Sequence, residues 1–241
     1  MKNTLRAAAA VLLAACFASA AFADEAAIRK NLAERIPDFP KIDEVLKTGM
    51  PGMYEIRIGT EILYTDENGS YLIQGEVIDT KTRANLTEQR IAKLTAIDFK
   101  SLPLKDAIVW KQGTGERKLV VFADPNCGYC KKFERDLQEV KNVTVYTFLY
   151  PILGGDSPEK SKAIWCAKDN TKAWREWMIK GTPAENSPNC DTSALQRNYA
   201  FGKKHRINGT PGLVFEDGSQ RAGALNADAI EKLLAVNRGK S

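Results

Sequence analysis

Apolar and polar residues alternate along residues 53–82, and this pattern predicts β-strands in the first half of the chain. The segment reads MYEIRIGTEILYTDENGSYLIQGEVIDTKT. Gly59-Thr60 breaks the alternation, Asn68-Gly69 is a strong hairpin-turn signal, and Gly75 fits a bulge. We therefore predict an antiparallel meander of three or four strands.

Helical patterns stand on both sides of this β-rich stretch. Residues 24–36 form a short pattern that ends at Pro37, and residues 85–99 read NLTEQRIAKLTAIDF. In the second pattern Asn85 can cap the first turn, with Glu88 three residues later. Its apolar face consists of Ile91, Leu94 and Ile97. Because most of its surface is charged, we predict a connector helix that holds two domains apart.

After Pro103 the pattern changes to strands that alternate with helices. KLVVFADP and VTVYTFLYPI are apolar runs typical of buried strands, and GYCKKFERDLQEV between them is helical. Helical stretches follow at residues 158–180 and 193–205, then a hairpin turning at Asp217-Gly218 and a capped terminal helix. This order, βαβ, a helical insertion and then ββα, predicts a central sheet covered by helices.

The first residues read as an export signal, which is absent from the mature chain. Lys2 and Arg6 precede the apolar run AAAAVLLAA, and AFA offers small residues for cleavage before Asp24. The run is shorter than the roughly 20 residues that span a bilayer. LAAC, ending at Cys16, also resembles a lipoprotein cleavage box, which would leave the chain lipid-anchored.

Two domains and a linker therefore follow the signal peptide of residues 1–23: an N-terminal α+β domain at 24–84, a linker helix at 85–102 and an α/β domain at 103–241. The small N-terminal sheet has little core and an exposed edge, so pairing with a second copy would cover both. Removing Lys2 and Arg6 lowers the net charge from +5 to +3. A surplus that small, dispersed among acidic residues, argues against a nucleic-acid partner.

Without Cys16 the chain keeps two cysteines three positions apart and two that are 24 apart. The close pair, Cys127 and Cys130, fits a zinc site poorly because the chain has a single histidine, His205. A c-type haem would need histidine where Lys131 stands. A purely structural disulfide remains an alternative, but so small a ring restricts the unfolded chain little.

Redox exchange is the interpretation that the placement of this pair supports. Cys127 falls at the start of a helix, where free backbone N–H groups and the helix dipole favour an anion. We expect its pKa to lie at about 3.5–7.5, as in exchange-active CxxC motifs. Cys130, one turn further, should be less exposed and act as the resolving thiol. Lys131 and Lys132 either add positive potential or are ordinary surface charges.

Two further features bear on this chemistry. Thr210-Pro211 begins the strand that follows the helical insertion, and the proline is either a trans turn residue or a cis residue lying against the CxxC pair. The CxxC upstream favours the cis form, which would offer backbone groups to a peptide. Cys166 and Cys190 fit a structural disulfide worth roughly 3 kcal/mol, the alternative being a second active pair.

At this point the chain resembles the DsbC/DsbG family of bacterial periplasmic disulfide isomerases over nearly all of its mature length. The segments that carry the resemblance are FADPNCGYCKKF, AIWCAKD around Cys166, NGTPGLVF, and the N-terminal MYEIRI and GSYLIQGEVID. The DsbG branch has proline after the first cysteine, where Gly128 stands here. The oxidase DsbA lacks the β-rich N-terminal domain.

The resemblance implies a cystatin-like α+β dimerisation domain, joined by a linker helix to an α/β thioredoxin-fold domain with a helical insertion. It also implies a periplasmic homodimer that reshuffles disulfides of misfolded exported proteins and receives electrons from a DsbD-like membrane reductant, without metal or other cofactor. A dithiol oxidase or reductase and a DsbG-like chaperone remain alternatives. The implied site residues are the catalytic Cys127 and Cys130, the substrate-binding Gly128, Tyr129, Thr210 and Pro211, and the disulfide partners Cys166 and Cys190.

Overall fold

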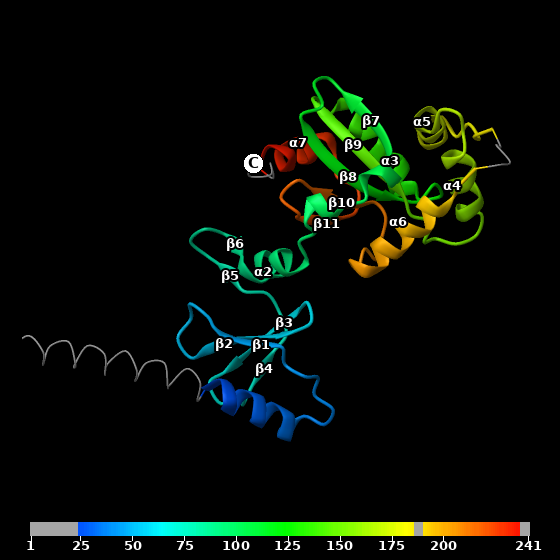
Figure 1. Cartoon of the computed structure of the whole chain (residues 1–241). Helices are drawn as coiled ribbons and strands as arrows, with labels where there is room; N and C mark the ends of the chain where they lie inside the picture. Colours follow the sequence, from blue (N-terminus) through cyan, green and yellow to red (C-terminus); the bar gives the residue numbers. More distant parts are fainter. Residues whose placement is uncertain (1–23, 186–189, 237–241) are drawn as a thin grey trace, which may run out of the picture. The chain divides into compact units, whose positions relative to one another are not determined.

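The computed structural model describes residues 24–185 and 190–236, which divide into two compact units, Met1–Leu94 and Thr95–Ser241 (Figure 1). The predicted signal peptide, and Cys16 within it, lie outside the described residues. Among the helices of the described ranges, none has the length and apolar character needed to cross a membrane.

The first unit is a helix packed on a four-stranded antiparallel sheet. The helix covers residues 24–35. The sheet runs in the order β1 (Glu44–Lys47), β2 (Met53–Ile58), β3 (Glu61–Asp66) and β4 (Leu72–Ile73). The predicted meander is confirmed, including the turn at Asn68-Gly69, and β1 is a strand that the sequence analysis missed. Helix and sheet share a small core of Ile28, Leu32, Ile42, Tyr54, Ile56 and Leu63.

A short hairpin, β5 (Ile78–Asp79) and β6 (Ala84–Asn85), leads into α2 (Leu86–Thr95). The Asn85 side chain accepts a hydrogen bond from the backbone N–H of Glu88 at 2.9 Å, which is the predicted cap. Arg90 is bound to Glu55 and Glu44 of the sheet. The helix is therefore held against the first unit, rather than standing free as a charged spacer.

The predicted continuation of this helix to Phe99 is wrong. α2 ends at Thr95, and the backbone N–H of Ile97 donates to the carbonyl of Gly218 at 2.9 Å. Ile97 is 1% exposed and lies in a core of the second unit. Its spacing from Leu94 fits a helix, but burial in the second unit draws the chain out of helical geometry.

The second unit is built on a five-stranded sheet in the order β11-β10-β8-β9-β7. Its strands are β7 (Ile108–Gln112), β8 (Arg117–Ala123), β9 (Val143–Leu149), β10 (Gly212–Phe215) and β11 (Gln220–Ala222). β8 and β9 are parallel and the other neighbours are antiparallel. The predicted order of elements along the chain, βαβ, a helical insertion and then ββα, is confirmed, with β7 as an unpredicted edge strand.

The helices of this unit are α3 (Gly128–Asp136), α4 (Ser157–Trp165), α5 (Asn170–Lys180), α6 (Ser193–Lys204) and α7 (Ala227–Val236). Short 3-10 turns lie at η1 (Phe99–Ser101), η2 (Leu104–Asp106) and η3 (Leu137–Glu139). The insertion predicted between β9 and β10 consists of α4, α5 and α6. The stretch predicted as helical over 158–180 consists of two helices. Asp169 caps the second one, because its side chain accepts a hydrogen bond from the backbone N–H of Lys172 in the first turn of α5.

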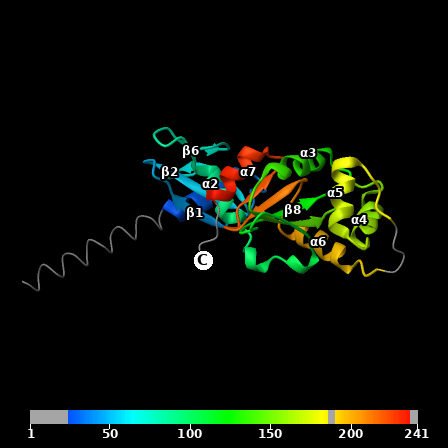
Figure 2. The ribbon, with the colours of Figure 1, turned by 90° about the horizontal axis from the view of Figure 1, so that it is seen from above.

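Apolar residues fill both faces of the sheet, so β8 is buried on each side. Leu119, Val121 and Ala123 point into a core shared with α3, α5 and α7, and Val120 and Phe122 into a core on the opposite face. Figure 2 shows α3 on one side of the sheet and α6 on the other. β8 is thereby fixed in place, and its end positions the CxxC segment.

Candidate active site

The CxxC segment begins where the central strand β8 ends. Asp124, Pro125 and Asn126 connect Ala123 to α3, and Cys127 is the residue that caps the helix, with φ −73° and ψ 114°. The sequence predicts Cys127 at the first turn of this helix. The structure places it one residue before Gly128, where its side chain can face the free N–H groups of that turn.

The sulfur of Cys127 is surrounded by hydrogen-bond donors that favour its charged form. Its Sγ accepts the backbone N–H of Cys130 at 3.2 Å. The pKa of Cys127 is lowered to about 6, mainly by the Cys130 thiol, then by the Thr210 side chain and the backbone N–H groups of Cys130 and Tyr129, while burial opposes the shift. This value lies within the predicted range. The largest contribution comes from the partner thiol rather than from the helix backbone.

Cys130 has the opposite character. It is 1% exposed, compared with 5% for Cys127. Burial raises the pKa of Cys130 far above its usual range, and the hydrogen bond to Cys127 adds to this. Between them, Tyr129 is 71% exposed and a side chain at Gly128 would meet open space. The surface over the two sulfurs is therefore open to a large partner.

The Thr210–Pro211 segment lies against Cys127. Its peptide bond is cis, and the thiol of Cys127 donates to the carbonyl oxygen of Thr210 at 3.2 Å. The Thr210 hydroxyl is buried and has no hydrogen-bond partner within the ranges described. The Pro211 carbonyl accepts the N–H of Gly223 at 2.9 Å, which ties this loop to β11. The fold thus brings together residues that are more than 80 positions apart in sequence.

A fully buried carboxylate, Asp124, fixes the turn that leads to Cys127. Its Oδ1 accepts the backbone N–H of Asn126 at 2.8 Å and the hydroxyl of Ser157 at 2.7 Å, and its Oδ2 accepts the N–H of Leu153 at 3.0 Å. Its backbone carbonyl accepts the N–H of Cys127 at 3.0 Å. The bonds to Asn126 and Cys127 shape the turn before the CxxC segment, and the bonds to Leu153 and Ser157 attach this turn to the start of the helical insertion.

Asn126 extends this connection along α4. Its amide donates to Asp156 at 2.7 Å and to Ser157 at 2.9 Å, and its oxygen accepts the Lys160 ammonium at 2.8 Å. We call Asp124, Asn126, Asp156, Ser157 and Lys160 the α4 clamp. The sequence does not predict this clamp, because nothing in FADPN indicates which distant residues its polar side chains contact.

Trp177 of α5 covers the same entrance from another direction. Its indole N–H donates to the carbonyl of Pro125 at 2.7 Å. The ammonium groups of Lys131 and Lys160 lie 4.6 and 4.7 Å from the centre of a Trp177 ring, which is cation–π range. Lys132 instead pairs with Asp136 at 2.7 Å. The two lysines after Cys130 are thus engaged with neighbouring side chains on the helix surface.

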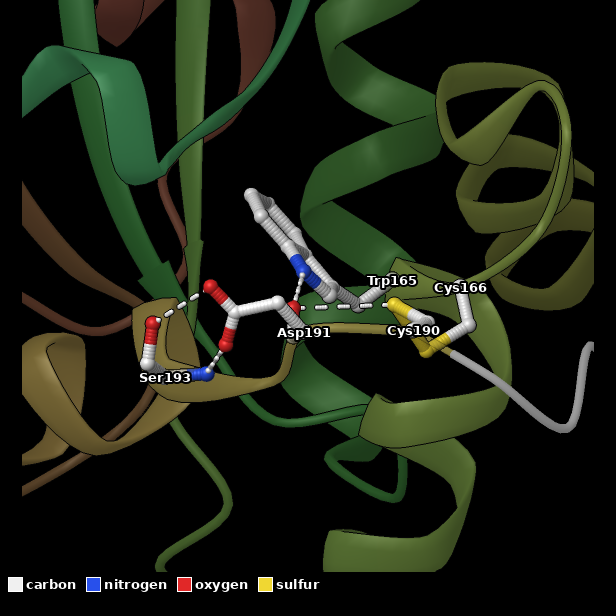
Figure 3. The surroundings of a disulfide bond; sticks show 5 residues. All are labelled: Trp165, Cys166, Cys190, Asp191 and Ser193. Carbon is white, nitrogen blue, oxygen red and sulfur yellow. Dashed lines mark hydrogen bonds between the residues drawn. A yellow bond between two sulfur atoms is a disulfide. The ribbon is translucent and has the colours of Figure 1, made fainter.

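The second cysteine pair is joined as a disulfide within the insertion, with a Cα–Cα distance of 5.5 Å (Figure 3). Cys166 ends α4, and Cys190 precedes α6. Next to the bridge, the indole N–H of Trp165 donates to the carbonyl of Asp191 at 3.0 Å. Asp191 in turn binds Ser193 at the start of α6. These contacts fasten the end of α4 to the beginning of α6.

The remaining sequence candidates lie away from the sulfurs. His205 caps the end of α6 and stacks on Phe201 with ring centres 4.3 Å apart. In the part of the chain that the structure describes, no three His, Cys, Asp or Glu side chains are grouped so that they could hold a metal ion. The site therefore consists of two thiols, a cis-proline loop and the polar contacts that position them.

Comparison with known proteins agrees with this geometry. Residues 19–88 match the disulfide bond isomerase protein N-terminal domain, and residues 104–236 match the thioredoxin-like domain. The chain is 40% identical over 209 residues to the probable thiol:disulfide interchange protein DsbC of Bordetella pertussis, covering 86% of this chain and 73% of the relative. It is 31% identical over 214 residues to the thiol:disulfide interchange protein DsbC of Escherichia coli, covering 86% of each.

A solved structure supports the same fold. The disulfide interchange protein from Neisseria gonorrhoeae is 34% identical, with a TM-score of 0.55, over 58% of this chain and 100% of that one. The predicted fold class, a DsbC-type α+β domain followed by a thioredoxin-fold domain, is confirmed. The sulfur geometry, the two matched domains and the relatives lead to one assignment: the chain belongs to the DsbC family of thiol:disulfide interchange proteins.

Proposed function

We propose that this protein is a disulfide isomerase that reshuffles incorrect disulfides in exported proteins through a reduced Cys127–Cys130 pair. The observation that carries the proposal is the contrast between the two sulfurs. The pKa of Cys127 is lowered to about 6, and that of Cys130 is raised by burial. At pH 7, about nine-tenths of Cys127 is then thiolate, while Cys130 stays protonated. The Cys127 sulfur can therefore attack a disulfide at neutral pH, while the Cys130 sulfur remains a thiol.

The reaction conserves electrons within a set of sulfur atoms. The Cys127 thiolate attacks one sulfur of a client disulfide, forms a mixed disulfide, and expels the other client sulfur as a thiolate. A client thiolate then attacks the client sulfur bound to Cys127, which forms a new client disulfide and releases the Cys127 thiolate. Client bonds have been exchanged without net oxidation or reduction. No cofactor is needed, because sulfur carries the electrons throughout.

Cys130 provides an exit when the client fails to react. Its sulfur attacks Cys127, which forms the Cys127–Cys130 disulfide and releases the client as a dithiol. The client is thereby reduced by two electrons and the enzyme is oxidised. Return to the active form requires an external dithiol, and we assign this role to a DsbD-like membrane reductant.

The surface around the sulfurs suits an extended client segment. Tyr129 offers an exposed aromatic ring, and Gly128 leaves the approach to Cys127 free of side-chain atoms. The loop containing Thr210 and Pro211 lies beside Cys127 and can pair its backbone with that of the client. We assign substrate binding to these four residues, in contacts that depend little on the client sequence.

We further propose a homodimer formed through the first unit. The described sheet ends at β4, whose residues Leu72 and Ile73 are 41% and 45% exposed, and Tyr71 just before it is 73% exposed. An open strand edge with apolar side chains is a site for pairing with another strand. Two copies would hold one misfolded client by several weak contacts while either thiolate reaches its disulfide.

A lysine at the sheet edge tests the dimer. Leu72→Lys should give a monomer in sedimentation experiments that still reduces small disulfides but isomerises a protein substrate poorly. Lysine is a residue that blocks edge pairing in natural sheets. The matched control is Lys81→Leu, a reverse change in the exposed turn between β5 and β6. A Leu72→Lys variant that remains dimeric would contradict this interface.

We place the protein in the periplasm, where the export signal predicted at residues 1–23 would deliver it. The thiol state of each cysteine, trapped directly in cells, separates an isomerase from an oxidase. The isomerase is found with Cys127 and Cys130 reduced and Cys166–Cys190 bridged, and it becomes oxidised when the membrane reductant is deleted. An oxidase is found with both pairs bridged. A measured mass equal to that of a chain beginning at Asp24 would confirm cleavage before Asp24 and would exclude a lipid anchor at Cys16.

The activity itself is tested with a scrambled multi-disulfide substrate. Wild-type protein should restore the native disulfides, and Cys127→Ser should lose this ability. Cys130→Ser is the informative companion, because it keeps the nucleophile but lacks the resolving thiol and should accumulate mixed disulfides. Rescue by Cys127→Ser at the wild-type rate would end the proposal. Suppression of aggregation by the same variant without any folding defect in cells would favour a chaperone.

A further inference from the structure

A buried carboxyl group, Glu134, lies on the inner face of α3 and has no part in the chemistry described so far. Its residue is 2% exposed. The Oε1 atom accepts the indole N–H of Trp174 at 2.6 Å, whereas Oε2 is buried and has no hydrogen-bond partner in residues 24–185 and 190–236. Burying a carboxyl oxygen without a partner costs free energy. Its retention in the core points to a use.

Glu134 stands one helical turn after the resolving thiol. Residues four positions apart share a helix face, with their Cβ atoms about 5–6 Å apart. Long side chains in a helix also lean back over the preceding turn. Glu134 therefore extends over the turn that carries Cys130. Both residues are buried, Cys130 in the core to which α3 and α5 contribute and Glu134 against Trp174 of α5.

The resolving step of the proposed function needs a proton acceptor at this place. Cys130 is a thiol whose pKa is raised by burial, and only its thiolate attacks the mixed disulfide. At 1% exposure, Cys130 has little access to water that could take the proton. Moving the proton to a buried carboxylate keeps the net charge of the core constant, so no second buried charge is created.

We propose that Glu134 accepts the proton of the Cys130 thiol during resolution and returns it when the active-site disulfide is reduced. This deepens the proposed exchange function and rests on it. The proton passes from Cys130 Sγ to the Glu134 carboxylate, and the Cys130 sulfur forms a bond to Cys127. The Cys127–client bond breaks, and its electron pair leaves with the client thiolate. In the reverse direction, an external dithiol attacks Cys127, and the released Cys130 thiolate regains its proton.

The surroundings of Glu134 suit this exchange. Burial raises the pKa of Glu134 to about 7, and the hydrogen bond from Trp174 and the charge of Arg175 on α5 partly oppose the rise. A group with this pKa both takes and gives protons near neutral pH. Arg175 lies 4.9 Å over the ring of Trp110, and Lys131 lies over Trp177, so neither ammonium nor guanidinium neutralises Glu134 in an ion pair among the described residues.

The other buried carboxylate near the sulfurs, Asp124, is less suited to the role. Its two oxygens already accept three hydrogen bonds, from Asn126, Ser157 and Leu153. These bonds occupy both oxygens and hold the side chain in the α4 clamp. Glu134 has an oxygen without a hydrogen-bond partner in the described residues, and it stands four positions after Cys130 on the same helix.

The test separates formation of the mixed disulfide from its resolution in the full-length protein. Reduced enzyme is mixed with oxidised glutathione, and quenched samples are analysed by mass for the glutathione adduct and the Cys127–Cys130 disulfide. In wild type, the resolution rate should rise with pH through a midpoint near 7. Glu134→Gln should slow resolution about 100-fold and abolish that midpoint. Adduct formation and the pKa of Cys127 should be unchanged. The matched control, exposed Glu139→Gln, should behave as wild type.

The outcomes distinguish this inference from the proposed function. If wild type forms no adduct at Cys127, the exchange function itself fails. If the adduct forms and folded Glu134→Gln resolves it at the wild-type rate and pH dependence, only the role of Glu134 is overturned.

A second variant keeps the carboxyl group and decides the matter if Glu134→Gln does not fold. Trp174→Phe removes the hydrogen bond that lowers the pKa of Glu134, so the midpoint for resolution should move to higher pH. The pKa of Cys127 should not follow it. An unmoved midpoint would refute the proposal.

Discussion

The two cysteine pairs of the second unit occupy very different surroundings. Cys127 and Cys130 are free thiols in one turn of helix, and the first accepts hydrogen bonds that stabilise its thiolate. Cys166 and Cys190 are bridged, 24 positions apart, and connect the end of one helix to the start of another. A pair of cysteines thus serves disulfide exchange in one place and cross-links the chain in the other.

The difference teaches that spacing and local electrostatics decide the role of a cysteine. A bridge across three positions restricts the unfolded chain little, so its formation is weakly favoured and easily reversed. A bridge across 24 positions removes much more chain entropy. Reactivity then depends on a lowered pKa, and the Cys130 thiol, the Thr210 side chain and backbone N–H groups supply it only at Cys127.

Removing the nucleophile should have the largest effect on the difference between the two cysteine pairs. Cys127→Ala should reduce the rate of insulin disulfide reduction to background, because a protonated, buried Cys130 cannot replace it. The assay is precipitation of reduced insulin in the presence of a dithiol. Unfolding in urea should stay near wild type, which serves as the control. Residual activity above a few per cent would mean that the second pair also exchanges.

Removing the bridge should have the converse effect. The double variant Cys166→Ala/Cys190→Ala should lower the free energy of unfolding by about 3 kcal/mol, because the unfolded chain gains freedom. Its rate of insulin reduction per folded molecule should stay within about twofold of wild type. Urea titration gives the first quantity. A large loss of exchange with intact folding would show that the bridge acts on the active site.

Asn126 offers a sharper test, since it belongs to neither pair but links them through α4. Asn126→Ala removes three hydrogen bonds of the α4 clamp and should cost about 1–2 kcal/mol of stability. Looser support of the turn before Cys127 should also slow attack on client disulfides. Glu159→Ala, on the same helix but outside the clamp, is the control. Equal effects of the two substitutions would argue against a role for the clamp.

The smallest expected effect concerns the Thr210 hydroxyl. Thr210→Val keeps the shape of the side chain but removes a group that lowers the pKa of Cys127. A contribution of about 1 kcal/mol from the hydroxyl corresponds to a rise of roughly one unit, so the pKa should move from about 6 toward 7. The pH dependence of iodoacetamide alkylation measures the shift. If the pKa of Cys127 in Thr210→Val equals that of wild type, the hydroxyl has no influence on the Cys127 thiolate.

Much of this arrangement could be predicted from the sequence, where the determinants are local. The apolar run of β8, the helix after Gly128 and the cap at Asn85 follow from residues that are neighbours in the chain. Cys127 lies within one residue of its predicted helical position for the same reason.

Features that depend on distant contacts were missed or mistaken. β7 was not predicted, because Val109 is apolar although exposed, so apolar and polar residues do not alternate along this strand. Ile97 was assigned to a helix because its spacing fits, although the second unit buries it. The α4 clamp joins side chains about 30 positions apart, and polar residues in a loop do not identify their partners. Glu134 could have been noticed, because it shares the buried face of α3 with Cys130 and Phe133.

The most direct test of the central claim is the pH at which Cys127 ionises. Thiolate absorbance near 240 nm, recorded across pH in Cys130→Ala and wild type and paired with alkylation of Cys127 followed by mass, resolves the two sulfurs. In wild type, we predict a Cys127 midpoint at about 6 and no ionisation of Cys130 below pH 9. In Cys130→Ala the Cys127 midpoint should rise, because the largest stabilising hydrogen bond is lost. A wild-type Cys127 midpoint near the ordinary thiol value of about 8.5 would contradict the account.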